Sequence, residues 1–255
     1  MGNQIEKWRN DETALAVERR LMNEALALLG QTEIKHSDRG RAGRLIFGID
    51  LTASREPSLH RARIATAALF ETIKTVGAIA VRLVYFRGTA ECRASKWYDD
   101  PEILSQSMLG LSCESGMTQI ARLLHLVLAE KENISAVVYV GDHCEDDSAE
   151  LVRLAKSLGQ RAMPLFIFHE CADHDERSLK AKPVFKRMAE ASGGQYVEFK
   201  PDSGATLREM LTSVAAVSAG GVEGLERLAL PKTSEARRLR GRLLLGSGGD
   251  PKRMR

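Results

Sequence analysis

The chain has 255 residues, of which 44% are hydrophobic and 28% are charged. The length allows one large α/β domain or two small ones, and the composition predicts an ordinary soluble core. No apolar segment approaches the roughly 20 residues of a membrane-spanning helix, and the amino-terminal residues lack the apolar segment of a signal peptide. We therefore expect a cytoplasmic protein that has no membrane partner and whose cysteines are free thiols.

The net charge of +3 is unevenly distributed along the chain. Residues 231–255 contain eight basic and two acidic residues and carry +6, so the remainder carries −3. We interpret residues 219–255, which are rich in glycine and arginine, as a basic tail that is partly disordered. Nucleic-acid binding through this tail is an alternative function, although the tail has no aromatic residue to stack on bases.

Residues 1–43 are expected to form a helix over 11–30 and a polar linker. From 44 to 218, short apolar segments alternate with segments of helical periodicity. We predict strands at 44–50, 78–88, 89–99, 135–142, 162–170 and 195–199. We predict helices at 59–77, 101–109, 117–132, 147–159, 179–194 and 204–217.

This alternation predicts a doubly wound α/β domain, in which helices flank a mainly parallel six-stranded sheet. The strand at 89–99 is expected to be an antiparallel edge strand. Ser148 is a candidate helix cap, and the helix at 179–194 is expected to bend or begin near Pro183. Right-handed crossovers place the carboxyl ends of the parallel strands at one edge, where ligands bind.

Three loops with oxygen-bearing side chains should meet at that edge. In FGIDLTASREPSLH, residues 47–60, Asp50 ends a strand, and Thr52 and Ser54 follow at steps of two. CESGMTQI contains Thr118 at the start of a helix, and VVYVGDHCEDD places Asp142 directly after a buried strand. Each residue alone could be a helix cap or a turn residue. Together they offer only oxygen, which is the preferred ligand of Mg²⁺ and Mn²⁺.

The segments DLTAS, SGMT and VGDHCED resemble the metal-ion-dependent adhesion site (MIDAS) of von Willebrand factor A (VWA) domains. The similarity runs from about residue 44 to 218 and implies the Rossmann-like VWA fold. By this resemblance the metal ligands are Asp50, Thr52, Ser54, Thr118 and Asp142. A threonine at position 52 replaces the first serine of the family's Asp-x-Ser-x-Ser motif. A histidine, residue 143, stands where the family often has glycine.

The resemblance also implies a function. A partner protein would donate an Asp or Glu to a bound Mg²⁺ or Mn²⁺, and His143, Arg55 and Ser115 are expected to contact that partner. Similarity to intracellular bacterial-type members suggests a role in assembling a complex, with an ATPase or a chaperone as the expected partner. We expect a binding module that has no catalytic residue and is not an enzyme.

An enzymatic alternative starts from the same aspartate. Haloacid-dehalogenase-like phosphatases also place an aspartate after the first strand, but they need a second carboxylate two residues later as acid and base. Here that position is Thr52, whose hydroxyl is a poor general acid or base at neutral pH. A metal-dependent hydrolase is therefore the less favoured interpretation.

Two further groupings are weaker. His169, Cys171 and His174 could suggest zinc, but a fourth ligand is missing and the spacing matches no standard zinc motif. His143 and Cys144 could suggest a nucleophile and its base, but adjacent side chains on a loop seldom face each other. A solvated loop is the preferred interpretation of residues 169–176, and Cys–His catalysis at residues 143 and 144 is disfavoured.

Overall fold

The structure is a computed structural model, and it describes residues 43–56, 79–100, 103, 106–108, 110–171, 174–200 and 204–246. The predicted helices at 11–30 and 59–77 lie outside these residues, together with parts of the helix predicted at 101–109 and the end of the tail. None of the helices in the described ranges combines the length and apolarity needed to span a membrane.

Six strands form a single sheet in the order β3-β2-β1-β4-β5-β6. Neighbouring strands are parallel except β2 and β3, which are antiparallel. This topology confirms the predicted mainly parallel sheet with one antiparallel edge strand. The strands are β1 (Gly43–Asp50), β2 (Ile79–Arg87), β3 (Glu91–Tyr98), β4 (Ala136–Gly141), β5 (Leu165–Glu170) and β6 (Tyr196–Phe199).

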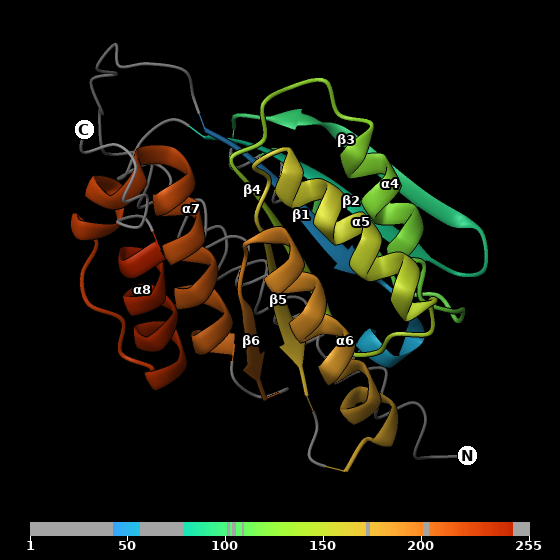
Figure 1. The fold of residues 1–255 in the computed structure, drawn as a ribbon. Coiled ribbons are helices and arrows are strands. Elements are labelled where there is room, and N and C mark those ends of the chain that lie inside the picture. The colour runs from blue at the N-terminus through green and yellow to red at the C-terminus, as the bar shows by residue number, and fades with distance from the viewer. Residues whose placement is uncertain are drawn as a thin grey trace, which may run out of the picture. The chain divides into compact units, whose positions relative to one another are not determined.

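Helices cover both faces of this sheet (Figure 1). The helices with described bounds are α4 (Ile120–Leu128), α5 (Ser148–Gln160), α6 (Glu176–Ser192), α7 (Gly204–Glu226) and α8 (Ser234–Gly246), with a short 3-10 helix, η1 (Ala53–Arg55). Apolar residues of α4, α5 and α6 form one buried cluster with the sheet, and those of α7 and α8 form the other. Because both faces are covered, β4 and β5 are buried along their whole length.

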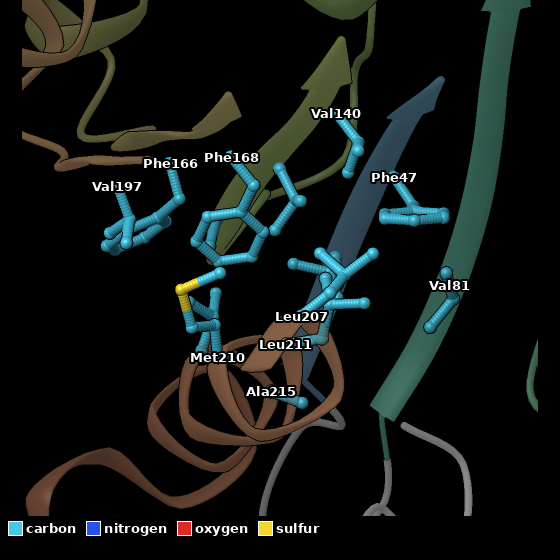
Figure 2. Packing of buried hydrophobic residues seen from close by; sticks show 14 of the residues in the cluster. Phe47, Val81, Val140, Phe166, Phe168, Val197, Leu207, Met210, Leu211 and Ala215 are labelled. Atoms are coloured by element: carbon cyan, nitrogen blue, oxygen red, sulfur yellow. The ribbon is translucent and has the colours of Figure 1, made fainter. Parts of the chain in front are cut away.

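The cluster on the α7 face consists of aliphatic and aromatic side chains from several strands. Figure 2 shows Leu207, Met210 and Leu211 of α7 directed towards the sheet side chains, which include Phe47 and Phe168. These residues are almost completely buried. Such burial stabilises the fold by about 1.5–3 kcal/mol per large apolar side chain.

The segment after residue 219, which we predicted to be a basic tail, contains regular structure. The helix α7 continues to Glu226, with a break at Gly221, where φ is +60° and only glycine is unstrained. In α8, Leu239 and Leu243 are buried in the same cluster as α7. Residues up to Leu244 therefore contribute to the core of the sheet domain.

Two helix starts differ from the prediction. Asp147, not Ser148, caps α5, because its side chain accepts the amide hydrogen of Glu150. The α6 helix begins at Glu176, well before Pro183, because Asp175 caps it through the amides of Arg177 and Ser178. An aspartate that precedes a helix thus fixed the start in both cases.

Candidate metal centre

Acidic side chains lie at the carboxyl ends of three neighbouring strands. Asp50 is the last residue of β1, Glu170 is the last residue of β5, and Asp142 follows β4, which lies between them. Gly141 is paired with His169 across β4 and β5, so Asp142 and Glu170 are the next residues on adjacent strands. All three acids are at least nine-tenths buried. The fold therefore concentrates negative charge at one edge of the sheet.

The turn after β1 places Thr52 in contact with both Asp50 and Ser54. The Thr52 amide donates a hydrogen bond of 2.7 Å to Asp50 Oδ1, which forms an Asx-type turn. The hydroxyls of Thr52 and Ser54 lie 3.2 Å apart. Although Thr52 precedes η1, its side chain makes no capping hydrogen bond to that helix. The hydroxyl pair thus has no capping function in η1.

Two carboxylate oxygens at this edge of the sheet are buried without a hydrogen bond among the described residues. Asp50 Oδ2 and Asp142 Oδ1 are buried, and neither has a hydrogen-bond partner among the described residues. Burial, followed by the negative charge of Asp142, raises the pKa of Asp50 to about 6. Because an unpaired buried carboxylate is costly, each of these two oxygens is a candidate ligand for a cation.

Thr118 is held by the loop that follows Asp142. Its hydroxyl donates to Asp146 Oδ2 at 2.9 Å and accepts the amide hydrogen of Glu145 at 2.8 Å. The Thr118 amide in turn donates to Glu145 Oε2. The hydroxyl oxygen has one lone pair left, so these contacts fix its orientation and still permit a metal bond.

The loop that carries Thr118 is also attached to β1 and to the β2–β3 turn. The Glu114 amide donates to the Leu51 carbonyl at 3.0 Å. A Cβ on Gly116 would lie only 1.9 Å from the Gly88 carbonyl oxygen, so this contact requires glycine. Three loops that are distant in the sequence are thereby joined by hydrogen bonds and close packing.

Of the expected partner contacts, Ser115 is exposed, but Arg55 is not available at the surface. The Arg55 side chain is 2% exposed and forms an ion pair with Glu170, so it does not lie at the surface where we expected a partner contact. The reason is that the turn after Ser54 directs Arg55 inwards against a buried acid. Sequence reasoning missed Met117, which is 61% exposed and immediately precedes Thr118.

His143 is buried rather than displayed at the surface. Its Nε2 lies 2.6 Å from Asp175 Oδ2, and its Nδ1 lies 3.7 Å from Asp142 Oδ2. Since Asp175 also caps α6, His143 connects the loop after β4 to the start of that helix. Its role in this structure is to support the loop from within.

The weaker zinc grouping is not assembled. His169 is buried, with Nδ1 at 2.8 Å from the Tyr196 hydroxyl and Nε2 at 3.0 Å from the Asp142 carbonyl oxygen, while His174 is exposed. Burial lowers the pKa of His169 to about 4, so the ring is neutral and donates from Nε2 to that carbonyl. Within the described residues, no three side chains of His, Cys, Asp or Glu form a metal-binding group. His169 instead stabilises the loop that contains Asp142 through this hydrogen bond.

The neighbouring cysteine is not a prepared nucleophile. Burial, followed by the charge of Asp146, raises the pKa of Cys144 to about 12. A thiol with such a pKa is protonated at neutral pH and reacts slowly. Among the described residues, this edge therefore offers carboxylate oxygens and no reactive thiol, and Arg55 forms an ion pair with Glu170 there.

Comparison with solved structures identifies the fold. A von Willebrand factor type A protein from Catenulispora acidiphila is 17% identical, with a TM-score of 0.55 over 70% of this chain and 43% of that chain. The VWA domain of SpRpn10 is 15% identical, with a TM-score of 0.50 over 71% of this chain and 98% of that domain. This chain adopts the VWA fold. A search of protein-family models and a search of curated proteins found no match.

A third VWA-fold neighbour carries a metal ion. Proximal thread matrix protein 1 from the mussel byssus, with a zinc-occupied MIDAS motif, is 11% identical, with a TM-score of 0.51 over 68% of this chain and 46% of that chain. The match spans less than half of that protein and of the Catenulispora protein. The chain thus combines a VWA fold with acids and hydroxyls that lie at the carboxyl edge of the sheet.

Proposed function

We propose that the chain is a metal-dependent protein-binding module of the MIDAS type. Asp50, Thr52, Ser54, Thr118 and Asp142 would hold one divalent cation, and a partner protein would supply an Asp or Glu to complete its coordination. The observation that carries this proposal is the pair of buried oxygens, Asp50 Oδ2 and Asp142 Oδ1, that lack partners among the described residues. A cation would satisfy both oxygens at once.

The donor set suits a hard cation. Two carboxylates and three hydroxyls present oxygen only, which favours Mg²⁺ or Mn²⁺. The occupied MIDAS of the mussel protein supports a divalent ion in general. With three neutral ligands in the set, the bound ion would keep enough positive charge to attract a further carboxylate.

The surroundings support an open side for a partner. Ser54, Ser115 and Met117 are exposed at the loops that carry the candidate ligands. A flexible apolar side chain such as Met117 adapts to varied partner surfaces. The partner would therefore present an acidic residue next to an apolar one. We further propose that this partner is an ATPase or a chaperone and that the two proteins form an intracellular assembly.

Calorimetric titration of Mg²⁺ and Mn²⁺ into chelator-stripped protein tests the proposal. We expect saturable binding that is lost in the double variant Asp50→Ala with Asp142→Ala. The matched control is Glu132→Ala with Glu223→Ala, which also removes two carboxylates, both exposed and paired elsewhere. Equal binding by both double variants would show that the ion binds elsewhere, and the proposal would be wrong.

A second experiment tests partner capture. An immobilised chain would be incubated with an array of peptides that contain Asp or Glu, in Mn²⁺ and in chelator. We expect retention of acidic peptides in Mn²⁺ only, and loss of retention when the acid is replaced by Asn or Gln. Retention that is the same in chelator would contradict a metal-bridged interaction.

A further inference from the structure

A buried cation lies beside the candidate metal site and has no role in the proposed coordination. Arg55 directly follows Ser54 in the chain, and its side chain is 2% exposed. It pairs with Glu170, whose strand β5 adjoins the strand that ends before Asp142. Arg55 is thus held at the edge of the site by an acid that is not itself a candidate ligand.

Electrostatics link this arginine to the metal ligands as well as to Glu170. Burial opposes the charge of Arg55, but the carboxylates of Glu170, Asp142 and Asp50 outweigh this effect and raise the pKa of Arg55. A guanidinium carries five N–H donors and forms strong bonds to carboxylates. Asp50 Oδ2 and Asp142 Oδ1 lack hydrogen-bond partners within the described part of the chain, so they are attractive acceptors for Arg55.

We propose that Glu170 is a positioning residue that retains Arg55 and so keeps this internal cation from taking the place of the divalent ion between Asp50 and Asp142. This inference rests on the proposed metal site. It assigns opposite roles to the two members of one ion pair, because Glu170 favours metal binding and Arg55 opposes it. A salt bridge with a purely structural role would favour metal binding through both members.

The test is a comparison of three variants by Mn²⁺ calorimetry and by thermal unfolding with and without Mn²⁺. Glu170→Gln should weaken Mn²⁺ binding by about 10- to 100-fold, the range found for residues that support metal ligands. Arg55→Met should bind Mn²⁺ more tightly than the wild type, and Mn²⁺ should raise its Tm by more. The double variant Arg55→Met with Glu170→Gln should recover most of the affinity lost in Glu170→Gln. Glu130→Gln, which breaks an ion pair with Arg82 near the end of α4, is the control.

The outcomes separate this inference from the metal site itself. If the wild type binds no Mn²⁺, the proposed site is wrong, and this inference falls with it. If the wild type binds but both single variants bind more weakly, or Glu170→Gln binds like the wild type, the positioning role alone is wrong. If Arg55→Met fails to fold because Glu170 is left buried without its partner, the Mn²⁺ affinity of the double variant still tests the inference. Weak binding in the double variant, equal to that of Glu170→Gln, would overturn the inference.

Discussion

The carboxylate of Asp146 joins a candidate metal ligand to the start of a helix. It accepts the hydroxyl hydrogen of Thr118 at 2.9 Å, and it also accepts the amide hydrogens of Ile120 and Ala121 at 3.1 and 3.0 Å. One side chain therefore caps α4 and orients Thr118. The stability of this helix and the geometry of the proposed metal site are coupled through it.

Asp146→Ala should reduce both properties. We expect a loss of about 1–2 kcal/mol in the free energy of unfolding from the missing cap, and a loss of Mn²⁺ affinity of about tenfold or more. Asp147→Ala is a matched control, because Asp147 caps α5 through the Glu150 amide and its hydrogen bond does not involve Thr118. Urea unfolding should show similar losses for both variants, whereas calorimetry should show weaker binding only for Asp146→Ala. Equal affinities would contradict the coupling.

The cap of α4 by Asp146 is a contact that could not be predicted from the sequence. The strand ends were predictable, because apolar segments followed by Asp50 and by Asp142 mark the carboxyl edge of a parallel sheet. We considered Thr118 as a possible cap for its helix. The cap comes instead from Asp146, which is 26 residues from Ile120 in the chain. No local capping pattern predicts such a contact.

The buried charges were missed for a similar reason. Arg55 and Glu170 are 115 residues apart, and charged residues are usually exposed, so nothing in the local pattern predicts that they meet. The contact of His169 with the Asp142 carbonyl was missed for the same reason, because the two residues are 27 positions apart in the chain. Periodicity predicts which apolar faces are buried, but the pairing of polar groups requires the three-dimensional arrangement of the loops.

Asp50→Asn should stabilise the metal-free protein while it abolishes the response to metal. The substitution removes a buried charge that repels Asp142, and its Oδ1 can still accept the Thr52 amide. We expect a gain of about 1–3 kcal/mol at pH 7, because a raised pKa of a carboxyl measures the cost of its ionised form. Thermal unfolding should show a higher Tm in chelator and no increase with Mn²⁺. A destabilised variant in chelator would contradict this account of the charge pair.

The raised pKa of Asp50 also gives a pH dependence. Its folded-state value of about 6 exceeds the ordinary 3.8, so metal-free stability should fall as the pH rises from about 4 to 6. The advantage of Asp50→Asn over the wild type should therefore vanish near pH 4. Because protons compete with metal for Asp50, Mn²⁺ affinity should fall about tenfold between pH 7 and pH 5. Affinity that is constant over this range would exclude Asp50 as the titrating ligand.

The last helix should depend on one acid of α7. Glu209 accepts hydrogen bonds of 2.9, 2.9 and 2.7 Å from the Lys232 amide, the Thr233 amide and the Thr233 hydroxyl, just before α8. Burial alone would raise the pKa of Glu209, but these hydrogen bonds outweigh it and lower the pKa. Glu209→Ala should therefore cost about 1–3 kcal/mol at pH 7, and the amides of α8 should exchange with solvent faster.

The pH profile of this variant distinguishes the cap from a loss of packing. Since the folded-state pKa of Glu209 is lowered, its stabilisation is present above the ordinary value of 4.5 and is lost as the pH falls through the folded-state value. The difference between wild type and Glu209→Ala should accordingly shrink below pH 4.5. Glu223→Ala, which removes an exposed acid from the same helix, should have little effect at either pH. A difference that stays constant with pH would mean that Glu209 contributes through packing, so that the charged cap is not what holds α8 against the core.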